Sequence, residues 1–370
     1  MTEPLETLPP HDHAARRGRL RQVLADQEPA PDLLLVTGVA NVRYLSGFTG
    51  SNGQLLIGTQ PDHDRLVTDA RYLDRAAHEA PELPVLRSRD APGAALTQVG
   101  AGRLAVEADH LTLAAGLALQ NRAAEAGADL VVSQGLVEQL RIVKDDAEVA
   151  RLERACALTV DALGWLLDTV VGVGVTELDL AVALEQRFVA LGAEAAAFPS
   201  IVAGGPHSAA PHHAPTARAL TPGDLLTIDC GARVEGYHAD CTRTVAIGHL
   251  DDQLAEVHEV VRQAQAAGRA ALHDGATGDQ VDAAAREVIE QAGYGPHFVH
   301  GTGHGVGLEI HEAPGIARGS SAALTDGTAL TVEPGVYLPQ VGGVRIEDTV
   351  LVAGGGARVL TDAPHGLRVM

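Results

Sequence analysis

The sequence contains few cysteines and few basic residues, and each scarcity excludes a class of protein. Three cysteines among 370 residues, with no CxxC spacing, argue against a disulfide framework or a structural zinc site. Lys and Arg number 27 against 48 Asp and Glu, which leaves a net charge of −21. A surface this acidic disfavours binding to nucleic acid or to an anionic membrane. We therefore expect small substrates or metal cations as partners.

Long hydrophobic runs are also missing. No apolar run reaches the roughly 18 residues that a membrane-spanning helix needs, and the N-terminal segment lacks the basic-then-apolar order of a secretory signal. These absences predict a cytoplasmic protein. Hydrophobic residues still make up 46% of the sequence, which is enough to form folded cores. Because a chain of 370 residues exceeds the usual size of one core, we expect two domains.

The first part of the chain alternates short β-like runs with Ala-rich helical stretches, a pattern typical of an α/β domain. A long segment with apolar residues at helical spacing then follows. Asp145 and Asp146 stand at its start, where a helix N-terminus favours acidic residues. These patterns predict a smaller α/β domain over residues 1–140 and a larger domain over residues 141–370.

The larger domain is predicted to contain two similar halves. Residues 174–192 align with residues 275–293, and the alignment matches the glycines at both ends. A further helix is expected before each of these segments, over residues 146–170 and 252–272. Each half therefore consists of two helices, a loop and a β-hairpin, which predicts an α+β domain with pseudo-twofold symmetry.

The two halves also end alike, because GDLLTIDCG at 223–231 aligns with GTALTVEPG at 327–335. A return strand follows each of these segments. Each predicted hairpin then contributes two carboxylates, Asp229 and Asp240 in the first and Glu333 and Glu347 in the second.

The first hairpin predicts a close pair of like charges. A two-residue turn at Val234 and Glu235 would place Asp229 directly opposite Asp240, with Cβ atoms about 4.5–5.5 Å apart. Like charges at this distance are destabilising unless a cation lies between them. Four carboxylates converge if the second hairpin is related to the first by a pseudo-twofold axis. So much negative charge in one site requires about two divalent cations.

A glycine-rich loop, HFVHGTGHGVGLEIHE, lies between the last helix and the second hairpin. Glycine lets a backbone approach a ligand closely, and neutral imidazole is a common metal ligand. One histidine of this loop is therefore expected to complete the metal site, from the set His297, His300, His304 and His311.

These residues also carry a resemblance to a known family. IDCGARVEGYHADCTRT, GTGHGVGLEIHE, TVEPGVY and GGVRIEDT, in this order and separation, resemble the signature of the pita-bread metallopeptidases, family M24. That family includes aminopeptidase P, prolidase and methionine aminopeptidase. The stretch NVRYLSGFTGSNG and the additional N-terminal domain resemble the Xaa-Pro branch. The resemblance thus implies a pita-bread catalytic domain, preceded by a smaller creatinase-like α/β domain.

The resemblance implies five ligands for two divalent metal ions: Asp229, Asp240, His304, Glu333 and Glu347. In that scheme Asp240 and Glu347 bridge the ions, and Glu333 also shuttles a proton. Four carboxylates favour hard ions, so Mn²⁺ ranks above Co²⁺ and Zn²⁺.

Further residues match positions that contact the substrate in this family. His212 matches a catalytic histidine that touches the substrate or the tetrahedral intermediate, and its neighbour His213 is the competing choice. His300 and His311 match other substrate-binding histidines, of which His311 is also assigned a catalytic role. Arg345 matches an arginine that forms hydrogen bonds within the site.

The implied activity is hydrolysis of the bond between an N-terminal residue and a following proline, as in Xaa-Pro aminopeptidase. The alternative is an Xaa-Pro dipeptidase (prolidase), which acts on dipeptides only. A creatinase-like C–N hydrolase or a non-catalytic peptide-binding protein is less favoured, because no implied metal ligand is missing. Short peptides with proline in the second position are the expected substrates. The family also implies a homodimer or a homotetramer.

Overall fold

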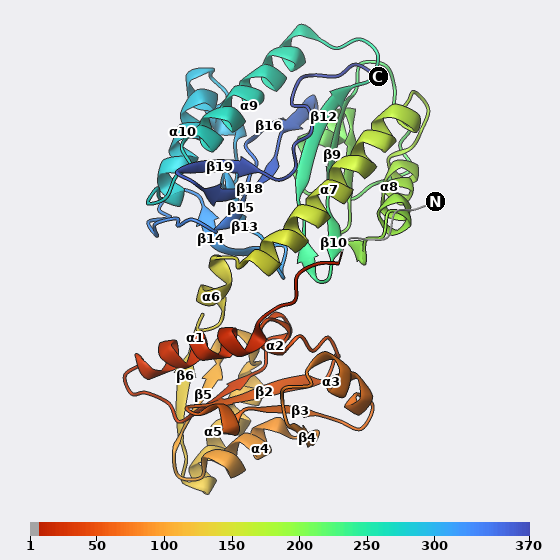
Figure 1. The fold of residues 1–370 in the computed structure, drawn as a ribbon. Coiled ribbons are helices and arrows are strands. Elements are labelled where there is room, and N and C mark those ends of the chain that lie inside the picture. The colour runs from red at the N-terminus through yellow and green to blue at the C-terminus, as the bar shows by residue number, and fades with distance from the viewer. Residues whose placement is uncertain (1–6) are drawn as a thin grey trace. The chain divides into compact units, whose positions relative to one another are not determined.

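The computed structural model describes residues 7–370 (Figure 1). The chain divides into two compact units. The first consists of Pro10–Arg141, and the second consists of Ile142–Met370 together with residues 7–9. None of the helices within residues 7–370 combines the length and the apolar character needed to cross a membrane.

A six-stranded mixed sheet forms the centre of the first unit, in the order β4-β3-β2-β1-β5-β6. Helices α4 and α5 cover one face of this sheet, and α1 and α2 lie on the other (Figure 1). Apolar side chains of the strands, such as Leu35, Leu56 and Val106, pack beneath α4 and α5. The strands are β1 (Leu33–Val36), β2 (Gly53–Gly58), β3 (Arg65–Thr68), β4 (Val85–Arg87), β5 (Arg103–Glu107) and β6 (Asp129–Ser133). The helices are α1 (His13–Ala25), α2 (Val39–Ser46), α3 (Leu73–Glu79), α4 (Ala91–Val99), α5 (Leu113–Ala126) and α6 (Glu138–Ile142).

The second unit contains the two helix pairs that the repeat predicted. They are α7 (Asp146–Thr169) with α8 (Glu177–Ala190), and α9 (Asp252–Ala270) with α10 (Gly278–Gln291). Thr176 and Thr277 cap the second helix of each pair, because each side-chain hydroxyl accepts a hydrogen bond from a backbone N–H of the first turn. Identical capping chemistry at repeat-related positions explains why both helices begin alike.

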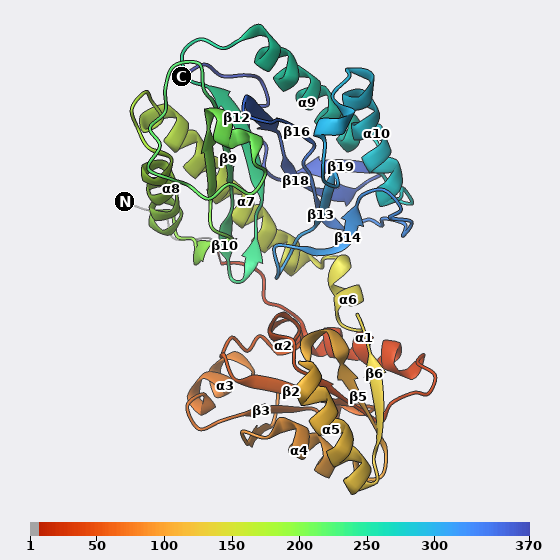
Figure 2. The ribbon, with the colours of Figure 1, turned by 180° about the vertical axis from the view of Figure 1, so that it is seen from behind.

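Short strands fill the space between these helices (Figure 2). In the first half they are β7 (Ala195–Ala196), β8 (Ile201–Gly204), β9 (Leu225–Cys230), β10 (Ala232–Val234), β11 (Tyr237–His238) and β12 (Cys241–Ala246). In the second half they are β13 (Gly303–Gly305), β14 (Glu312–Ile316), β15 (Ala329–Val332), β16 (Gly335–Leu338), β17 (Gly342–Arg345), β18 (Asp348–Ala353) and β19 (Gly356–Val359). Strands β9, β12, β15 and β18 are almost wholly buried, so the polar side chains on them need partners inside the protein.

The register of the first hairpin differs from the prediction. Asp229 pairs with Thr242 rather than with Asp240, because the turn consists of Glu235 and Gly236. Both turn residues have positive φ angles, 44° and 82°, as a two-residue type I′ turn requires. Asp240 lies two residues before Thr242, so it shares the face of Asp229 as a diagonal neighbour. The predicted direct opposition was wrong, whereas the predicted common face is correct.

In the second hairpin the two carboxylates do oppose each other. Val332 pairs with Asp348 and Gly335 pairs with Arg345. Continuing this register between the two pairs sets Glu333 opposite Glu347.

Candidate metal centre and active site

Five polar side chains from different strands meet in the second unit. Asp229 comes from β9, Asp240 directly precedes β12, Glu333 follows β15 and Glu347 precedes β18. Asp229, Asp240 and Glu347 are 8%, 5% and 1% exposed. The His304 side chain, from β13, places Nε2 3.7 Å from Asp240 Oδ2 and 3.4 Å from Glu333 Oε1. The structure thus brings together the five residues that the sequence motifs singled out.

Glycine lets the strand that carries His304 fit between its neighbours. A Cβ atom at Gly303 would lie 2.0 Å from the carbonyl oxygen of Thr331, and one at Gly305 would lie 2.2 Å from that of Ala313. The glycine-rich segment was predicted as a loop. It contains the short strand β13, because the missing side chains let the backbone approach β14 and β15.

Burial and mutual repulsion raise the pKa of the carboxylates. Burial is the largest cause for Asp240 and Glu347, and neighbouring carboxylates add to it, so both pKa values lie well above the ordinary range. Burial also raises the pKa of Glu333 to about 7, although the nearby Arg345 opposes the shift. In the absence of a cation, this cluster therefore favours protonated carboxyl groups.

Several atoms of the cluster lack the partners that buried polar groups normally have. Oδ1 of Asp229, Oδ1 of Asp240 and Oε1 of Glu347 are buried and accept no hydrogen bond. The second oxygen of Asp229 accepts from Arg345 Nη2 at 2.7 Å, and that of Glu347 accepts from Thr242 Oγ1 at 2.6 Å. One oxygen of each of these two carboxylates is held in place and the other is left open, which suits a metal ligand.

The tautomer of His304 also suits a metal ligand. Nδ1 lies 3.0 Å from the carbonyl oxygen of Gly305, which can only accept, so Nδ1 carries the proton. Burial lowers the pKa of His304, which keeps the ring neutral. Nε2 is then an unprotonated acceptor that faces the acceptor oxygens of Asp240 and Glu333. Lone pairs on these acceptor atoms face one another in a buried site, and a divalent cation between them would be bound by all of them. Ligand atoms of Asp240, His304 and Glu347 also lie within 4.8 Å of one another.

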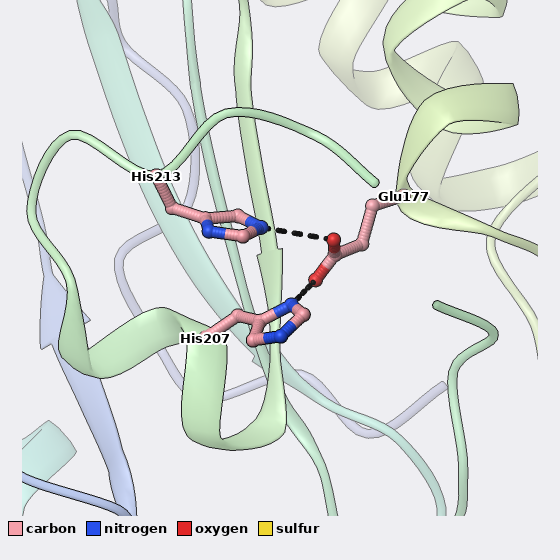
Figure 3. Close-up of side chains that lie close together, drawn as sticks. All are labelled: Glu177, His207 and His213. Carbon is pink, nitrogen blue, oxygen red and sulfur yellow. Dashed lines mark hydrogen bonds and ion pairs between the residues drawn. The ribbon is translucent and has the colours of Figure 1, made fainter. Parts of the chain in front are cut away.

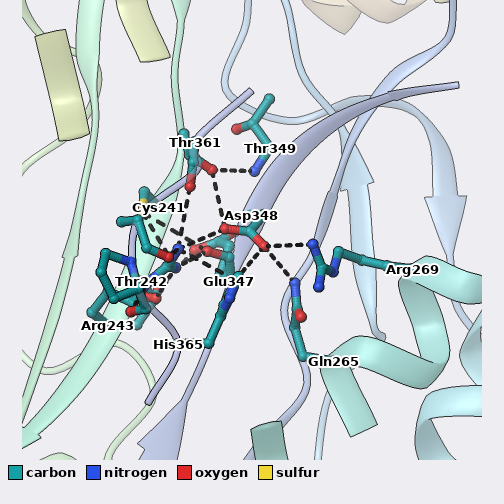
Figure 4. A network of polar contacts seen from close by, with 12 residues as sticks. Cys241, Thr242, Arg243, Gln265, Arg269, Glu347, Asp348, Thr349, Thr361 and His365 are labelled. Atoms are coloured by element: carbon teal, nitrogen blue, oxygen red, sulfur yellow. Dashed lines mark hydrogen bonds and ion pairs between the residues drawn. The ribbon is translucent and has the colours of Figure 1, made fainter. Parts of the chain in front are cut away.

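A second polar network fixes the backbone behind Glu347 (Figure 4). Arg243 donates to the carbonyl oxygen of Glu347 and to Asp348 Oδ1. Oδ2 of Asp348 accepts from Gln265 Nε2 and from His365 Nε2, each at 2.7 Å. The sequence motifs assigned no role to these supporting residues. Their partners come from segments distant in the sequence, so no local pattern reveals them.

A cavity of about 530 Å³ opens above the cluster. Asp229, Asp240, Glu333 and His304 line it, and Phe198, Pro199, Ile201, Pro215 and Ile310 supply apolar surface. The remaining lining residues that the sequence analysis singled out are His212, His213, His300, His311 and Arg345. His297 does not line this cavity.

The histidines around the cavity are held in different ways. His300 accepts from the hydroxyl of Tyr337 at 2.9 Å, and burial lowers its pKa to about 4. His311 stacks edge-on against His304, with ring centroids 4.4 Å apart, and burial also lowers its pKa. Both rings are therefore neutral at physiological pH. Tyr337 lies in the TVEPGVY motif, but the motif by itself predicted no role for this residue.

The structure separates the two adjacent histidines. His212 lies close enough to His300, His311 and Glu333 to act on them electrostatically. His213 instead bonds through Nε2 to Glu177 Oε2, at 2.9 Å. Of the two, His212 is placed among the other candidate site residues.

Arg345 connects several parts of the site. Its guanidinium donates to Asp229, to the hydroxyl of Tyr337, to Thr242 Oγ1 and to the carbonyl oxygen of Pro211. Four of its five N–H groups are therefore engaged by the protein.

Two repeat-related hairpins bring buried carboxylates with open oxygens to a neutral histidine beside a cavity, and this arrangement defines a metal-dependent hydrolase. The chain belongs to metallopeptidase family M24, whose sequence profile matches residues 150–353. Residues 16–143 match the Creatinase/Prolidase N-terminal domain. The pita-bread fold and the metallopeptidase class predicted from the motifs are thereby confirmed.

Individual relatives cover almost the whole chain. An uncharacterized peptidase of Bacillus subtilis, YqhT, is 39% identical over 347 residues, which are 92% of this chain and 96% of the relative. A solved structure described as Xaa-Pro dipeptidase from Bacillus anthracis superimposes with a TM-score of 0.91 at 36% identity, covering 97% of this chain and 100% of that one. An X-Pro aminopeptidase structure from Thermotoga maritima gives a TM-score of 0.87 at 33% identity, covering 96% and 99%.

Removing divalent cations should make stability fall as the pH rises above neutrality. The folded-state pKa values of Asp240, Glu333 and Glu347 are raised, so the folded protein holds protons that the unfolded chain releases above about pH 4.5. This contribution is complete below the unfolded pKa and is lost as the pH rises through the folded pKa. We expect the Tm of EDTA-treated protein to fall by about 3 °C or more between pH 6.5 and 8.5.

Differential scanning fluorimetry would measure this effect. The window begins at pH 6.5 because the lowered pKa values of His300, His304 and His311 act in the opposite direction below it. Added Mn²⁺ should raise the Tm more at pH 8.5 than at pH 6.5. A Tm of the metal-free protein that rises across this window would contradict the assignment.

Proposed function

We propose that this protein is a dinuclear-metal exopeptidase that removes the first residue from peptides with proline in the second position. The observation that carries the proposal is the set of unpartnered, buried oxygens of Asp229, Asp240 and Glu347. Asp229 and Asp240 line a cavity of about 530 Å³, a volume typical of a small-ligand site. The alternative is an Xaa-Pro dipeptidase, the name given to the relatives from Pyrococcus furiosus and Bacillus anthracis.

The residues that would hold the two ions in this proposal are Asp229, Asp240, His304, Glu333 and Glu347. Mn²⁺ is the proposed metal, ahead of Co²⁺ and Zn²⁺, because four of the five ligands are carboxylates. When bound, two such ions activate a water molecule and polarise the carbonyl of the scissile amide.

The residues of the chain supply the proton transfer and the positioning. An Xaa-Pro bond has no N–H, so the leaving nitrogen must receive a proton when the bond breaks. A carboxyl group whose pKa lies near neutrality suits both removal and return of a proton, and burial gives Glu333 such a pKa, about 7. His212 and His311 can donate to the oxygen that becomes negative in the transition state.

Substrate binding uses the other cavity residues. Phe198, Ile201 and Ile310 offer an apolar surface that suits the proline ring. His300 and Arg345 orient the peptide from the polar side. Within residues 7–370, Arg345 is the one arginine that lines this cavity, and most of its N–H groups are already engaged. A dipeptide carboxylate therefore finds little free positive charge there, which favours the aminopeptidase over the dipeptidase.

The proposal extends to the organisation of the whole protein. A creatinase-like domain over residues 1–140 precedes the catalytic domain over residues 141–370. The division into compact units between Arg141 and Ile142 supports this boundary. Assembly as a homodimer or a homotetramer and a cytoplasmic location also belong to the proposal, with short peptides as the substrates.

Hydrolysis of three matched peptides would test the activity. We expect EDTA-treated enzyme to be inactive, and added Mn²⁺ to restore release of glycine from Gly-Pro and Gly-Pro-Ala but not from Gly-Ala-Ala. Parallel additions of Co²⁺ and Zn²⁺ would rank the metals. Cleavage of Gly-Pro alone would establish the dipeptidase instead. Failure to cleave either proline peptide with two metal ions bound per chain would reject both activities.

A further inference from the structure

Glu177 forms a buried centre of hydrogen bonds outside the metal cluster (Figure 3). It lies in the first turn of α8 and is completely buried. Oε1 accepts from the backbone N–H of Gly204 and from His207 Nδ1, both at 2.8 Å. Oε2 accepts from His213 Nε2 at 2.9 Å and from the N–H and hydroxyl of Thr216 at 3.0 and 2.7 Å. The carboxylate of Glu177 therefore accepts five hydrogen bonds.

These contacts define the protonation states of Glu177, His207 and His213. Burial would raise the pKa of Glu177, but the five hydrogen bonds outweigh burial and lower it to about 2. The carboxylate is therefore charged and can only accept. It follows that His207 donates through Nδ1 and His213 donates through Nε2.

The donors are spread along one segment, residues 204–216, which we call the histidine loop. Gly204 and Thr216 are its two ends, and His207 and His213 lie between them. Residues 211–215 of this loop line the cavity, and His212 is among them. Glu177 therefore holds both ends of the loop and two points within it.

The opposite side of the loop rests on β17, the strand that ends in Arg345. The hydroxyl of Ser208 accepts from the N–H of Gly343 at 2.8 Å, and the carbonyl oxygen of Pro211 accepts from Arg345 Nη1 at 3.3 Å. Arg345 in turn holds Asp229. His212 thus stands between two anchored neighbours, Pro211 and His213, and faces the cavity.

We propose that Glu177 acts as a positioning residue, which holds the histidine loop through His207 and His213 so that His212 stays at the reacting bond. This inference rests on the proposed function of the cavity. Catalytic groups require placement within about 0.5 Å. Loosening the loop should therefore slow bond cleavage more than it weakens substrate binding.

A third metal ion is the competing explanation, because the ligand atoms of Glu177, His207 and His213 lie within 4.8 Å of one another. The hydrogen bonds argue against it. Both imidazole nitrogens that face Glu177 donate protons to it, and each carboxylate oxygen also accepts from the loop backbone. A metal ion would displace hydrogen bonds that already engage both carboxylate oxygens of Glu177 and one nitrogen of each imidazole.

Paired substitutions would test the positioning role. His213→Gln keeps an N–H donor where Nε2 lies, and His207→Asn keeps one where Nδ1 lies, whereas His213→Leu removes the donor. We expect His213→Leu to lower kcat about 10-fold with KM changed less than about threefold. His213→Gln and His207→Asn should retain most of kcat. His273→Leu, at an exposed histidine of the same unit, is the matched control.

A double-substitution cycle would show whether His213 acts through His212. If it does, His213→Leu should lower kcat no further in a His212→Ala background, because the group that it positions is already absent. An equal 10-fold loss in both backgrounds would overturn the proposal. So would a third metal ion per chain in the wild type that His213→Leu removes.

Hydrogen exchange of the metal-free protein provides a test that does not depend on activity. His213→Leu should increase amide exchange across residues 204–216, and His213→Gln and His273→Leu should leave it near the wild-type rate. Unchanged exchange in His213→Leu would reject the positioning role even if the enzyme is active. If the wild type cleaves no Xaa-Pro peptide, the proposed function fails, and the exchange result still decides whether Glu177 holds the loop.

Discussion

Glu347→Gln is expected to lower kcat/KM for Xaa-Pro peptides by at least ~10³-fold and to remove bound metal. Glu347 is 1% exposed and its Oε1 has no hydrogen-bond partner, so its negative charge is available only to a cation. Glutamine keeps the size of the side chain and an oxygen that can accept from Thr242, as Oε2 does now. The substitution therefore removes charge with little change in packing.

Metal analysis and a melting curve would separate loss of the site from loss of the fold. Metal-free Glu347→Gln should melt no lower than the metal-free wild type at pH 8.5, because one repelling charge is gone. Glu256→Gln, at an exposed position of α9, is the matched control and should bind metal as the wild type does. A Glu347→Gln protein with two ions per chain and full activity would refute the ligand assignment.

His212→Ala is expected to lower kcat by about 10² while the metal content stays unchanged. His212 lines the cavity near Glu333 and His311 but is not among the five proposed ligands. Removing a donor that acts mainly on the developing negative charge slows the chemical step more than it weakens ground-state binding. Steady-state kinetics on Gly-Pro-Ala, with metal measured in the same samples, would provide both numbers.

Substitution of an exposed histidine away from the site serves as the control for losing an imidazole ring. His273→Ala, beyond the end of α9, should keep the wild-type kcat and KM. If His212→Ala keeps the wild-type kcat with metal bound, the role assigned to His212 is wrong, and His213 becomes the next candidate. A loss of metal in His212→Ala would instead show that the loop supports the ligands.

The helices of the second unit could be predicted because their signals are local. Thr176 and Thr277 cap α8 and α10, and glycines with positive φ lie just beyond both ends of each helix. The carboxylates that share one site were also predictable, since the repeat aligns Asp229 with Glu333. Each of these inferences depends on spacing within a short segment or on comparison of two such segments.

The register of the first hairpin could not be predicted in the same way. Two turn positions one residue apart fit the alternation of side chains equally well. A type I′ turn at Val234 and Glu235 would need positive φ angles at two non-glycine residues, whereas the observed turn places one of its two positive φ angles on Gly236. Strand pairing across the whole buried ribbon from Leu225 to Ala246 stabilises this turn.

The amino-acid sequence by itself determined the family, the repeat, the five candidate ligands and the class of reaction, because these depend on residue types at set spacings. Only the tertiary structure showed that Glu177 holds His213, whereas His212 acts electrostatically on His311 and Glu333, although both adjacent histidines line the cavity. It alone also revealed the contacts of Arg345 with Asp229 and Tyr337. Arg345 and Asp229 are 116 residues apart, and His213 and Glu177 are 36 residues apart, so no local pattern encodes these contacts.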